Sequence, residues 1–264
     1  MRLAAVGDVH CRKTSRGAFE GLFAAMAAAA DVLVLCGDLT DYGLADEARV
    51  LVEELAAAGR VPVVAVLGNH DYESDGADRV KGILGDAGVK VLDGDECEIG
   101  GVGFAGVKGM GGGFGTRALQ PWGEDVIKRF VREAVEEALK LESALAKLKT
   151  SQRVAVLHYS PIRETVEGEP PEVFPFLGSS RLEEPLLRYP VAVALHGHAH
   201  HGRFEGRTRN DVPVYNVCIP VLERVNPGHQ PFWTVDLDPA ASPSPVTRGL
   251  GVATGKSDTV SGKI

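Results

Sequence analysis

The sequence has little cysteine and no long apolar run, and these shortages exclude several classes of protein. None of its four cysteines belongs to a C-x-x-C pair, so we expect neither a thiolate zinc site nor a redox motif. The longest apolar stretch, Leu22 to Ala30, covers nine residues, whereas a membrane-spanning helix needs about 20. The apolar residues before Asp8 are too few for a signal-peptide core. We therefore expect a cytoplasmic protein without a membrane partner.

Positive charge is also scarce. The formal net charge is −8 and no run of lysine and arginine stands out, which disfavours extended duplex nucleic acid as a partner. Short or single-stranded oligonucleotides stay open as substrates. What the chain has is 44% hydrophobic residues, enough to bury a core in a domain that we place at residues 1–238. From Pro239 the composition shifts to Pro, Ser, Gly and Thr, which predicts a disordered tail over residues 239–264.

Apolar runs alternate with helical patterns over the first ninety residues, which predicts βαβ units and a parallel sheet. Beyond Gly88 we expect short strands in a mixed extension, a mobile glycine-rich loop over 109–115 and a long amphipathic helix over 122–149. The predicted fold class is α/β. The predicted strands are 3–6, 32–36, 63–67, 89–92, 96–99, 102–107, 154–157, 191–195, 203–208, 212–217 and 232–237, and the earlier helices are 17–30, 44–58 and 75–87.

Five of the predicted core strands end in side chains able to bind metals or exchange protons. Ligands of open α/β sheets bind beyond the carboxyl ends of the strands, so we expect these five clusters to converge. Asp, Asn and His donors without thiolate suit Mn, Fe, Zn, Co or Ni. One ion takes about four ligands, and the surplus predicts two divalent ions with a bridging carboxylate. The clusters are Gly7-Asp8-Val9-His10, Gly37-Asp38-Leu39-Thr40-Asp41, Gly68-Asn69-His70-Asp71, His158, and His196-Gly197-His198-Ala199-His200.

This order of motifs resembles the calcineurin-like metallophosphoesterase superfamily. The motifs are Asp-x-His, Gly-Asp-x-x-Asp, Gly-Asn-His-Asp, a single His, and Gly-His-x-His, spread over about residues 2–220. Each is weakly specific alone, whereas all five in this order are strongly specific. The resemblance implies a four-layer α/β/β/α sandwich of two mixed β-sheets flanked by helices.

The resemblance also implies a role for each matching residue. His70 would be the catalytic general acid near the scissile phosphate, and the Asp41 carboxylate would orient it. No matching position departs from the family's pattern. One metal would be held by Asp8, His10, Asp38 and His200, and the other by Asp38, Asn69, His158 and His198.

Single residues have other interpretations. Asp8 or Asp38 alone could cap a helix, and Asn69 could occupy a turn. A lone histidine such as His158 could be a buried structural residue. Arg163, close after His158, is the cation we select for contact with the substrate phosphate.

Together these patterns predict an enzyme that hydrolyses a phosphate ester by metal-activated hydroxide attack, with His70 protonating the leaving group. The motifs are similar to those of bacterial phosphodiesterases, so our first interpretation is a phosphodiester of a small nucleotide-like substrate, with manganese a candidate metal. One alternative is a phosphomonoesterase, including a protein phosphatase. Another is a non-catalytic protein-binding scaffold, against which the complete ligand set argues.

Overall fold

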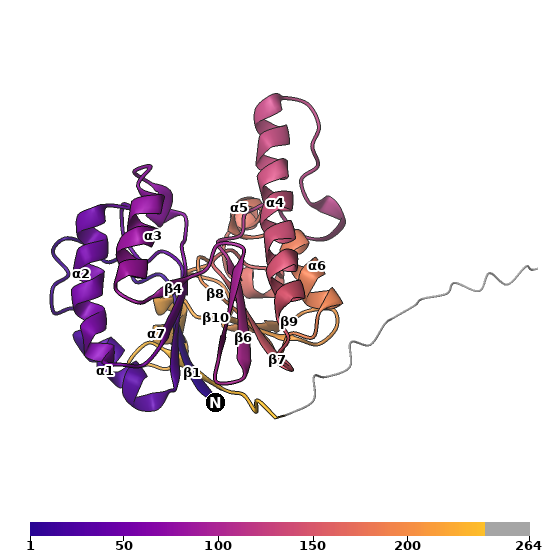
Figure 1. The fold of residues 1–264 in the computed structure, drawn as a ribbon. Coiled ribbons are helices and arrows are strands. Elements are labelled where there is room, and N and C mark those ends of the chain that lie inside the picture. Colours follow the sequence, from indigo (N-terminus) through magenta and orange to yellow (C-terminus); the bar gives the residue numbers. More distant parts are fainter. Residues whose placement is uncertain (241–264) are drawn as a thin grey trace, which may run out of the picture.

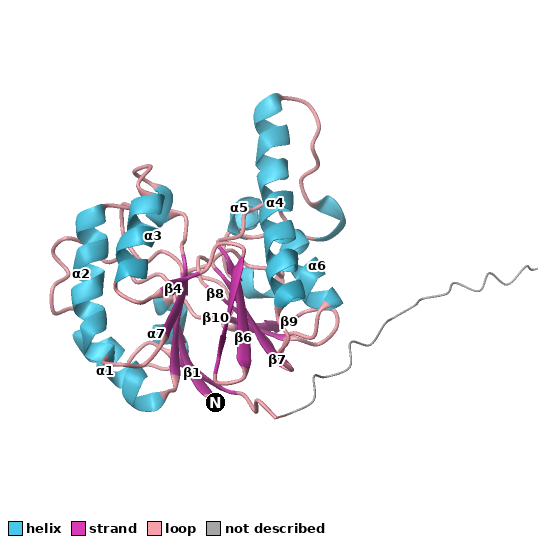
Figure 2. Cartoon of the chain, viewed as in Figure 1, coloured by secondary structure: helices cyan, strands magenta, loops and turns pink. Residues whose placement is uncertain are grey.

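In the computed structural model, the described residues 1–240 form two β-sheets that pack face to face between helices (Figure 1). The first sheet has the strand order β11-β1-β2-β3-β4 and the second has the order β5-β6-β7-β8-β10-β9. The predicted sandwich of two mixed sheets flanked by helices is confirmed (Figure 2). The tail predicted for residues 239–264 lies, from residue 241 on, outside the described residues.

Continuous apolar segments build the first sheet. Every residue of β2 and β3 is buried, as expected for parallel strands covered on both faces. Helices α1, α2 and α3 connect the parallel strands, and β11 pairs antiparallel with β1. The bounds are β1 (Arg2–Val6), α1 (Glu20–Ala29), β2 (Val32–Cys36), α2 (Ala45–Leu55), β3 (Val63–Val66), α3 (Ala77–Asp86), β4 (Lys90–Val91) and β11 (Trp233–Asp236).

The second sheet is parallel in its centre and antiparallel at both edges, where β5 pairs with β6 and β9 with β10. The mixed extension expected after Gly88 is divided between the sheets, because β4 joins the first and β5 and β6 join the second. The bounds are β5 (Asp95–Ile99), β6 (Val102–Val107), β7 (Gln152–Leu157), β8 (Val193–His196), β9 (Glu205–Arg207) and β10 (Pro213–Asn216).

Four helices accompany the second half of the chain. The predicted long helix is present as α4 (Asp125–Lys147), and its first turns project beyond the sheet, where Val126 is 59% exposed (Figure 1). No described helix is both long and apolar enough to cross a membrane. The three helices that the sequence did not predict are α5 (Phe174–Leu177), α6 (Ser180–Arg188) and α7 (Ile219–Val225). Single 3-10 turns are η1 (Ala56–Ala58), η2 (His70–Tyr72), η3 (Gly115–Arg117), η4 (Glu164–Val166) and η5 (Pro171–Val173).

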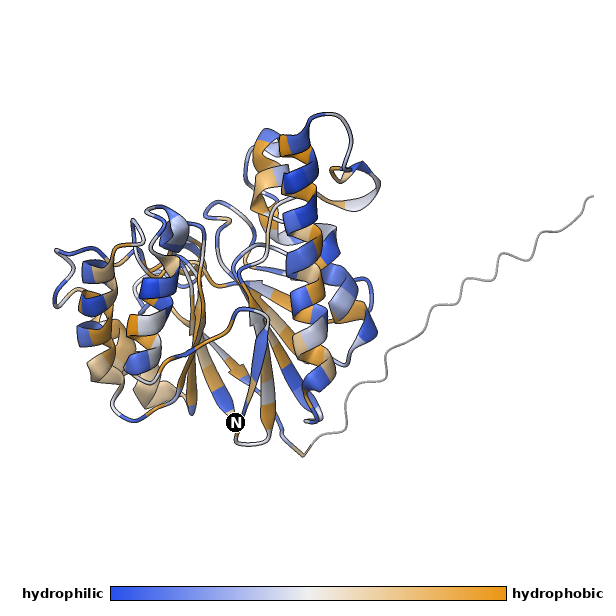
Figure 3. Cartoon of the chain, turned by 45° about the horizontal axis from the view of Figure 1, so that its top comes forward, coloured by the Kyte–Doolittle hydropathy of each residue, from blue (hydrophilic) through white to orange (hydrophobic). Residues whose placement is uncertain are grey.

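Alternate residues of β7 face two different apolar clusters. Val154 and Val156 pack against the first sheet, whereas Ala155 and Leu157 pack under α4 and α6. This period of two is the side-chain geometry of a strand with both faces buried. Figure 3 shows hydrophobic residues running through the strands, while the flanking helices carry hydrophilic residues as well.

The glycine-rich segment 109–115, for which we predicted a mobile loop, is largely buried and hydrogen-bonded to neighbouring elements. The Gly109 amide donates to the Glu137 carboxylate at 2.8 Å, and the Gly112 amide donates to the Pro175 carbonyl at 2.6 Å. Most of the segment is buried against α4 and the loop around α5. Its glycines therefore serve close packing rather than flexibility.

Candidate metal centre

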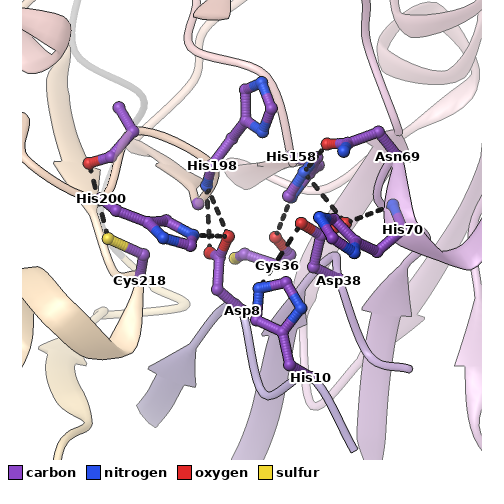
Figure 4. Close-up of polar contacts among 12 residues, drawn as sticks. Asp8, His10, Cys36, Asp38, Asn69, His70, His158, His198, His200 and Cys218 are labelled. Carbon is purple, nitrogen blue, oxygen red and sulfur yellow. Dashed lines mark hydrogen bonds and ion pairs between the residues drawn. The ribbon is translucent and has the colours of Figure 1, made fainter. Parts of the chain in front are cut away.

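The five polar clusters follow β1, β2, β3, β7 and β8, and the structure brings their side chains together (Figure 4). Three strands belong to the first sheet and two to the second, so the site lies where the carboxyl edges of both sheets meet. Glycine permits the close approach: Gly37 has φ +81°, and a Cβ there would overlap the His158 ring. All seven predicted ligands come from these clusters.

Asp8 organises one side of the centre. Its carboxylate lies 2.9 Å from Nε2 of His200 and accepts the main-chain N–H of His198 at 3.1 and 3.0 Å. Metal-ligating atoms of Asp8, His10 and His200 lie within 4.8 Å of one another. These are three of the four residues predicted for the first metal.

His158 organises the other side. Its Nδ1 lies 3.0 Å from the Cys36 carbonyl, and because a carbonyl only accepts, Nδ1 carries the hydrogen and Nε2 points into the site. Nε2 lies 3.3 Å from Asp38 and 2.9 Å from Oδ1 of Asn69. Asp38, His158 and His198 form a second group with ligand atoms within 4.8 Å. With Asn69, these are the residues predicted for the second metal.

Charge and burial act against each other in this site. Burial acts to lower the pKa of His158, but the carboxylates of Asp38 and Asp8 and the Cys36 carbonyl together raise that pKa to about 9. Burial likewise opposes ionisation of Asp38, and the neighbouring His158 holds the pKa of Asp38 well below its usual value. His198 has no such close carboxylate, and burial lowers its pKa to about 3. The hydrogen bond to Asp8 raises the pKa of His200.

His10 shows most directly that these residues fit a metal ion. Both of its ring nitrogens are buried without a hydrogen-bond partner among the described residues. The nearest carboxylate oxygens lie 3.4 Å from Nδ1, on Asp41, and 3.8 Å from Nε2, on Asp38. An unpaired buried donor–acceptor group is costly in a protein interior, and a cation would relieve that cost.

Several of the predicted ligands have a strained backbone conformation. Asp8, His10, Asp38 and His198 all have positive φ, at 61°, 47°, 47° and 70°. Non-glycine residues adopt this conformation at a cost of about 1–3 kcal/mol each, and such strain concentrates at functional sites. Four of the seven predicted ligands therefore have their side chains aimed by an unfavourable backbone geometry.

His70 lies beside the metal groups. Its Nδ1 is 2.8 Å from the main-chain oxygen of Asp41, and its main-chain N–H donates to Asp38 at 2.8 Å. We expected the Asp41 carboxylate to orient His70, but that carboxylate instead faces His10 and accepts from Nε of Arg12 at 2.8 Å. The main-chain carbonyl takes the orienting place, because the loop after β2 turns the Asp41 side chain toward β1.

Asp71 ties two of the loops together. Its fully buried carboxylate accepts the amides of Leu39, Thr40 and Gly68 and the hydroxyl of Thr40. Burial raises its pKa to about 6, against the opposing effect of these donors. Asp71 therefore holds the loop after β2 against the loop after β3.

Arg163 lies apart from the metal groups. Its side chain is 65% exposed, stacks over the Phe174 ring at 5.6 Å and comes within 3.9 Å of Glu167. It lines a cleft of about 800 Å³ that also includes Arg117 and Arg209 but none of the seven predicted ligands. No contact with the metal groups is present among the described residues, and its role in substrate binding stays a prediction.

Sequence analysis missed three residues that border the centre. The Tyr159 ring lies 4.4 Å from that of His198, and the main-chain oxygen of Phe176 lies 3.2 Å from His198 Nε2. Arg12 reaches Asp41 as described. The signal for Tyr159 was its position directly after His158, and for Arg12 its position two residues after His10, whereas nothing local in the sequence marks Phe176.

Comparisons with known proteins agree with this geometry. A family model described as calcineurin-like phosphoesterase matches residues 1–202. A search of curated proteins finds no match to the sequence. Among solved structures, the chain is similar to phosphopantetheinyl hydrolase from Mycobacterium tuberculosis, with a TM-score of 0.63 and 16% identity over 92% of this chain and 98% of that one.

Two further solved structures have a TM-score of 0.52. GAP50, the anchor in the inner membrane complex of Plasmodium, is 15% identical over 84% of this chain and 72% of its own. A purple acid phosphatase from yellow lupin seeds is 13% identical over 84% of this chain and 44% of its own. At these identities the likeness shows the shared fold alone. The family match, in contrast, spans more than half of the chain and includes all seven predicted ligands. The chain therefore belongs to the calcineurin-like phosphoesterase family and is a metal-dependent phosphoesterase.

Proposed function

We propose that this phosphoesterase uses two divalent ions, with manganese as first candidate, to hydrolyse a phosphodiester of a small nucleotide-like substrate. One observation carries the proposal: ligand atoms from both sheets form two groups, one around Asp8 and one around Asp38 and His158. A third group of His10, Asp38 and His70 links them, which supports Asp38 as the bridging residue. The diester preference rests on the similarity of the motifs to those of bacterial phosphodiesterases.

The residues of the site would have different roles according to their positions. Bound divalent ions would clamp phosphate oxygens and lower the pKa of a nearby water. Asp8 and Asp38 supply negative charge that holds the ions, and the hydrogen bond from His158 Nδ1 to Cys36 keeps Nε2 available. The contact with the Asp41 carbonyl fixes the hydrogen of His70 on Nδ1, so a protonated His70 would present Nε2–H to the leaving alkoxide.

The experiment joins metal analysis to a pair of substrates. Manganese-loaded protein should hydrolyse bis-p-nitrophenyl phosphate with a higher kcat/KM than p-nitrophenyl phosphate. A preference for the monoester would replace the diesterase proposal with a phosphomonoesterase. Filled metal sites without hydrolysis of either compound would favour a binding scaffold.

A matched pair of variants separates site effects from general effects of lost charge. Asp38→Asn should lose metal and turnover together, because a neutral amide bridges two cations poorly. Asp86→Asn removes the same charge from an exposed residue of α3 and should behave like the wild type. Equal activity of the two variants would contradict the role of Asp38.

A further inference from the structure

Lys108, the residue that follows β6, holds its ammonium group between two aromatic rings. Nζ lies 5.4 Å from the ring centroid of Tyr72 and 5.3 Å from that of Tyr159. Both distances fall within the range of cation–π contacts, which hold an ammonium in place without neutralising its charge.

Lys108 forms no ion pair among the described residues, although the carboxylates of Glu137, Glu133 and Asp93 act on its charge at longer range. Nζ donates to the Gly109 carbonyl at 2.9 Å and approaches the Met110 sulfur at 3.9 Å, and no carboxylate of the described residues lies within 4.0 Å. Lys140, nearby on the same side of the sheet, differs in bonding Glu137 at 2.7 Å and Asp93 at 3.2 Å. An ammonium has three N–H donors, so Lys108 retains donors for another oxygen.

This unpaired ammonium group lies near the His158 side of the proposed metal centre. The Tyr159 ring lies 5.5 Å from the His158 ring and 4.4 Å from the His198 ring. Tyr72 ends the 3-10 turn that begins at His70, and its side chain is 41% exposed. The main-chain N–H of His158 donates to the Lys108 carbonyl at 3.1 Å. The lysine thus lies beside the second metal group with one of its flanking rings open to solvent.

We propose that Lys108, positioned by Tyr72 and Tyr159, binds a second anionic group of the substrate, a phosphate other than the one being cleaved. This inference rests on the proposed phosphoesterase function and narrows its substrate class to nucleotides that carry a further phosphate. A half-buried ammonium that forms no direct ion pair gains more from an arriving phosphate than a lysine already paired, because no internal ion pair must break. The exposed face of Tyr72 gives that phosphate a route from solvent.

The test measures competitive inhibition of bis-p-nitrophenyl phosphate hydrolysis by the manganese-loaded protein. The probes are AMP, with one phosphate, and ADP and adenosine 3′,5′-bisphosphate, each with two. For the wild type we expect at least one two-phosphate probe to inhibit about tenfold more tightly than AMP. Equal inhibition constants for all three probes would overturn the inference, while continued hydrolysis would leave the proposed function intact.

Variants then assign the preference to this residue. Lys108→Met should remove most of the preference for two-phosphate probes over AMP, and Lys108→Arg should keep most of it. Lys90→Met is the control for loss of charge, because Lys90 is exposed and forms no ion pair among the described residues. A preference that persists in a metal-loaded Lys108→Met protein would overturn the assignment. Should that variant not fold, equal inhibition constants for the wild type would still overturn the inference, and Lys108→Arg would still test whether a cation is needed at this position. Absence of hydrolysis by the metal-loaded wild type would refute the proposed function and this inference with it.

Discussion

A single residue, His158, links the two sheets and sets the protonation of the site. Its ring is fully buried, hydrogen-bonds Cys36 of β2 through Nδ1, and meets Asp38 and Asn69 through Nε2. The nearby Asp38 carboxylate helps to keep the metal-free His158 ring charged near neutral pH, since the pKa of that ring is raised to about 9. A metal ion that binds through Nε2 must therefore displace a proton.

The raised pKa of His158 predicts that metal binding releases a proton. Because the folded pKa exceeds the unfolded value, His158 stabilises the metal-free protein fully below its ordinary pKa, and this contribution is lost as pH rises through about 9. Titration calorimetry with Mn²⁺ at about pH 7.5, in buffers of different ionisation enthalpy, should reveal release of about one proton. His158→Gln should release less. A binding enthalpy independent of the buffer would contradict the prediction.

His70 should be separable from the metal ligands. We expect His70→Ala to keep both metals and lose about 100-fold or more in kcat, because it removes proton transfer without removing a ligand. His201→Ala is the control, since only the main chain of His201 bonds Glu169 and its ring joins no metal group. Metal analysis of His70→Ala tests this prediction. A loss of bound metal as large as the loss of kcat would mean that His70 is a metal ligand together with His10 and Asp38.

At the scale of elements, the loops after β2 and β3 depend on one carboxylate. Asp71→Ala would leave the amides of Leu39, Thr40 and Gly68 without their acceptor, at about 1–3 kcal/mol for each unsatisfied group. We expect a lower melting temperature and weaker metal binding, measured by thermal unfolding and metal titration. Asp86→Ala, on the exposed end of α3, should change neither, and an Asp71→Ala protein as stable as this control would contradict the prediction.

Strands were easier to predict than short helices, for a physical reason. β2 and β3 of the first sheet bury both faces, so their sequences are short continuous apolar runs that predict buried strands. α6 contains Pro185, and α7 has Pro220 in its first turn, so both lack an uninterrupted helical pattern. Leu182 and Leu186 of α6 pack under the second sheet, whereas Leu222 of α7 belongs to the apolar cluster of the first sheet, and local sequence displays neither contact.

The candidate site was predictable where it depends on strand ends and not where it depends on tertiary contacts. The five clusters converge because parallel strands share a carboxyl edge, and the sequence shows that edge directly. The use of the Asp41 main-chain oxygen, in place of its carboxylate, depends on how one loop turns. The pairing of Lys108 with two tyrosines 36 positions before and 51 after it is equally invisible in the sequence.

For the whole molecule, the proposed metal centre would act as a cross-link between the two sheets. Of the proposed ligands, Asp8, His10, Asp38 and Asn69 follow strands of the first sheet, and the other three, all histidines, follow strands of the second. Ions bound at this junction stabilise only the folded state, by about 4 kcal/mol when present at about a thousand times their dissociation constant. Removal of metal by a chelator should therefore lower the melting temperature by about 10 °C.

The Asp38→Asn variant provides the comparison for that measurement. It lacks the proposed bridging ligand, so chelator should change its melting temperature much less than that of the wild type. An identical change in both proteins would mean that the stabilising ions bind elsewhere.

The pairing of β1 with β11 has a consequence for the nascent chain. β1 lies between β2 and β11, and the Met1 amino group meets the Leu237 carbonyl across 236 positions of sequence. One edge of β1 therefore stays without its native partner until residues 233–236 have left the ribosome. Until then its free N–H and C=O groups are a template on which another chain can pair. Translation that stalls before this last strand would release a chain prone to aggregate through its first.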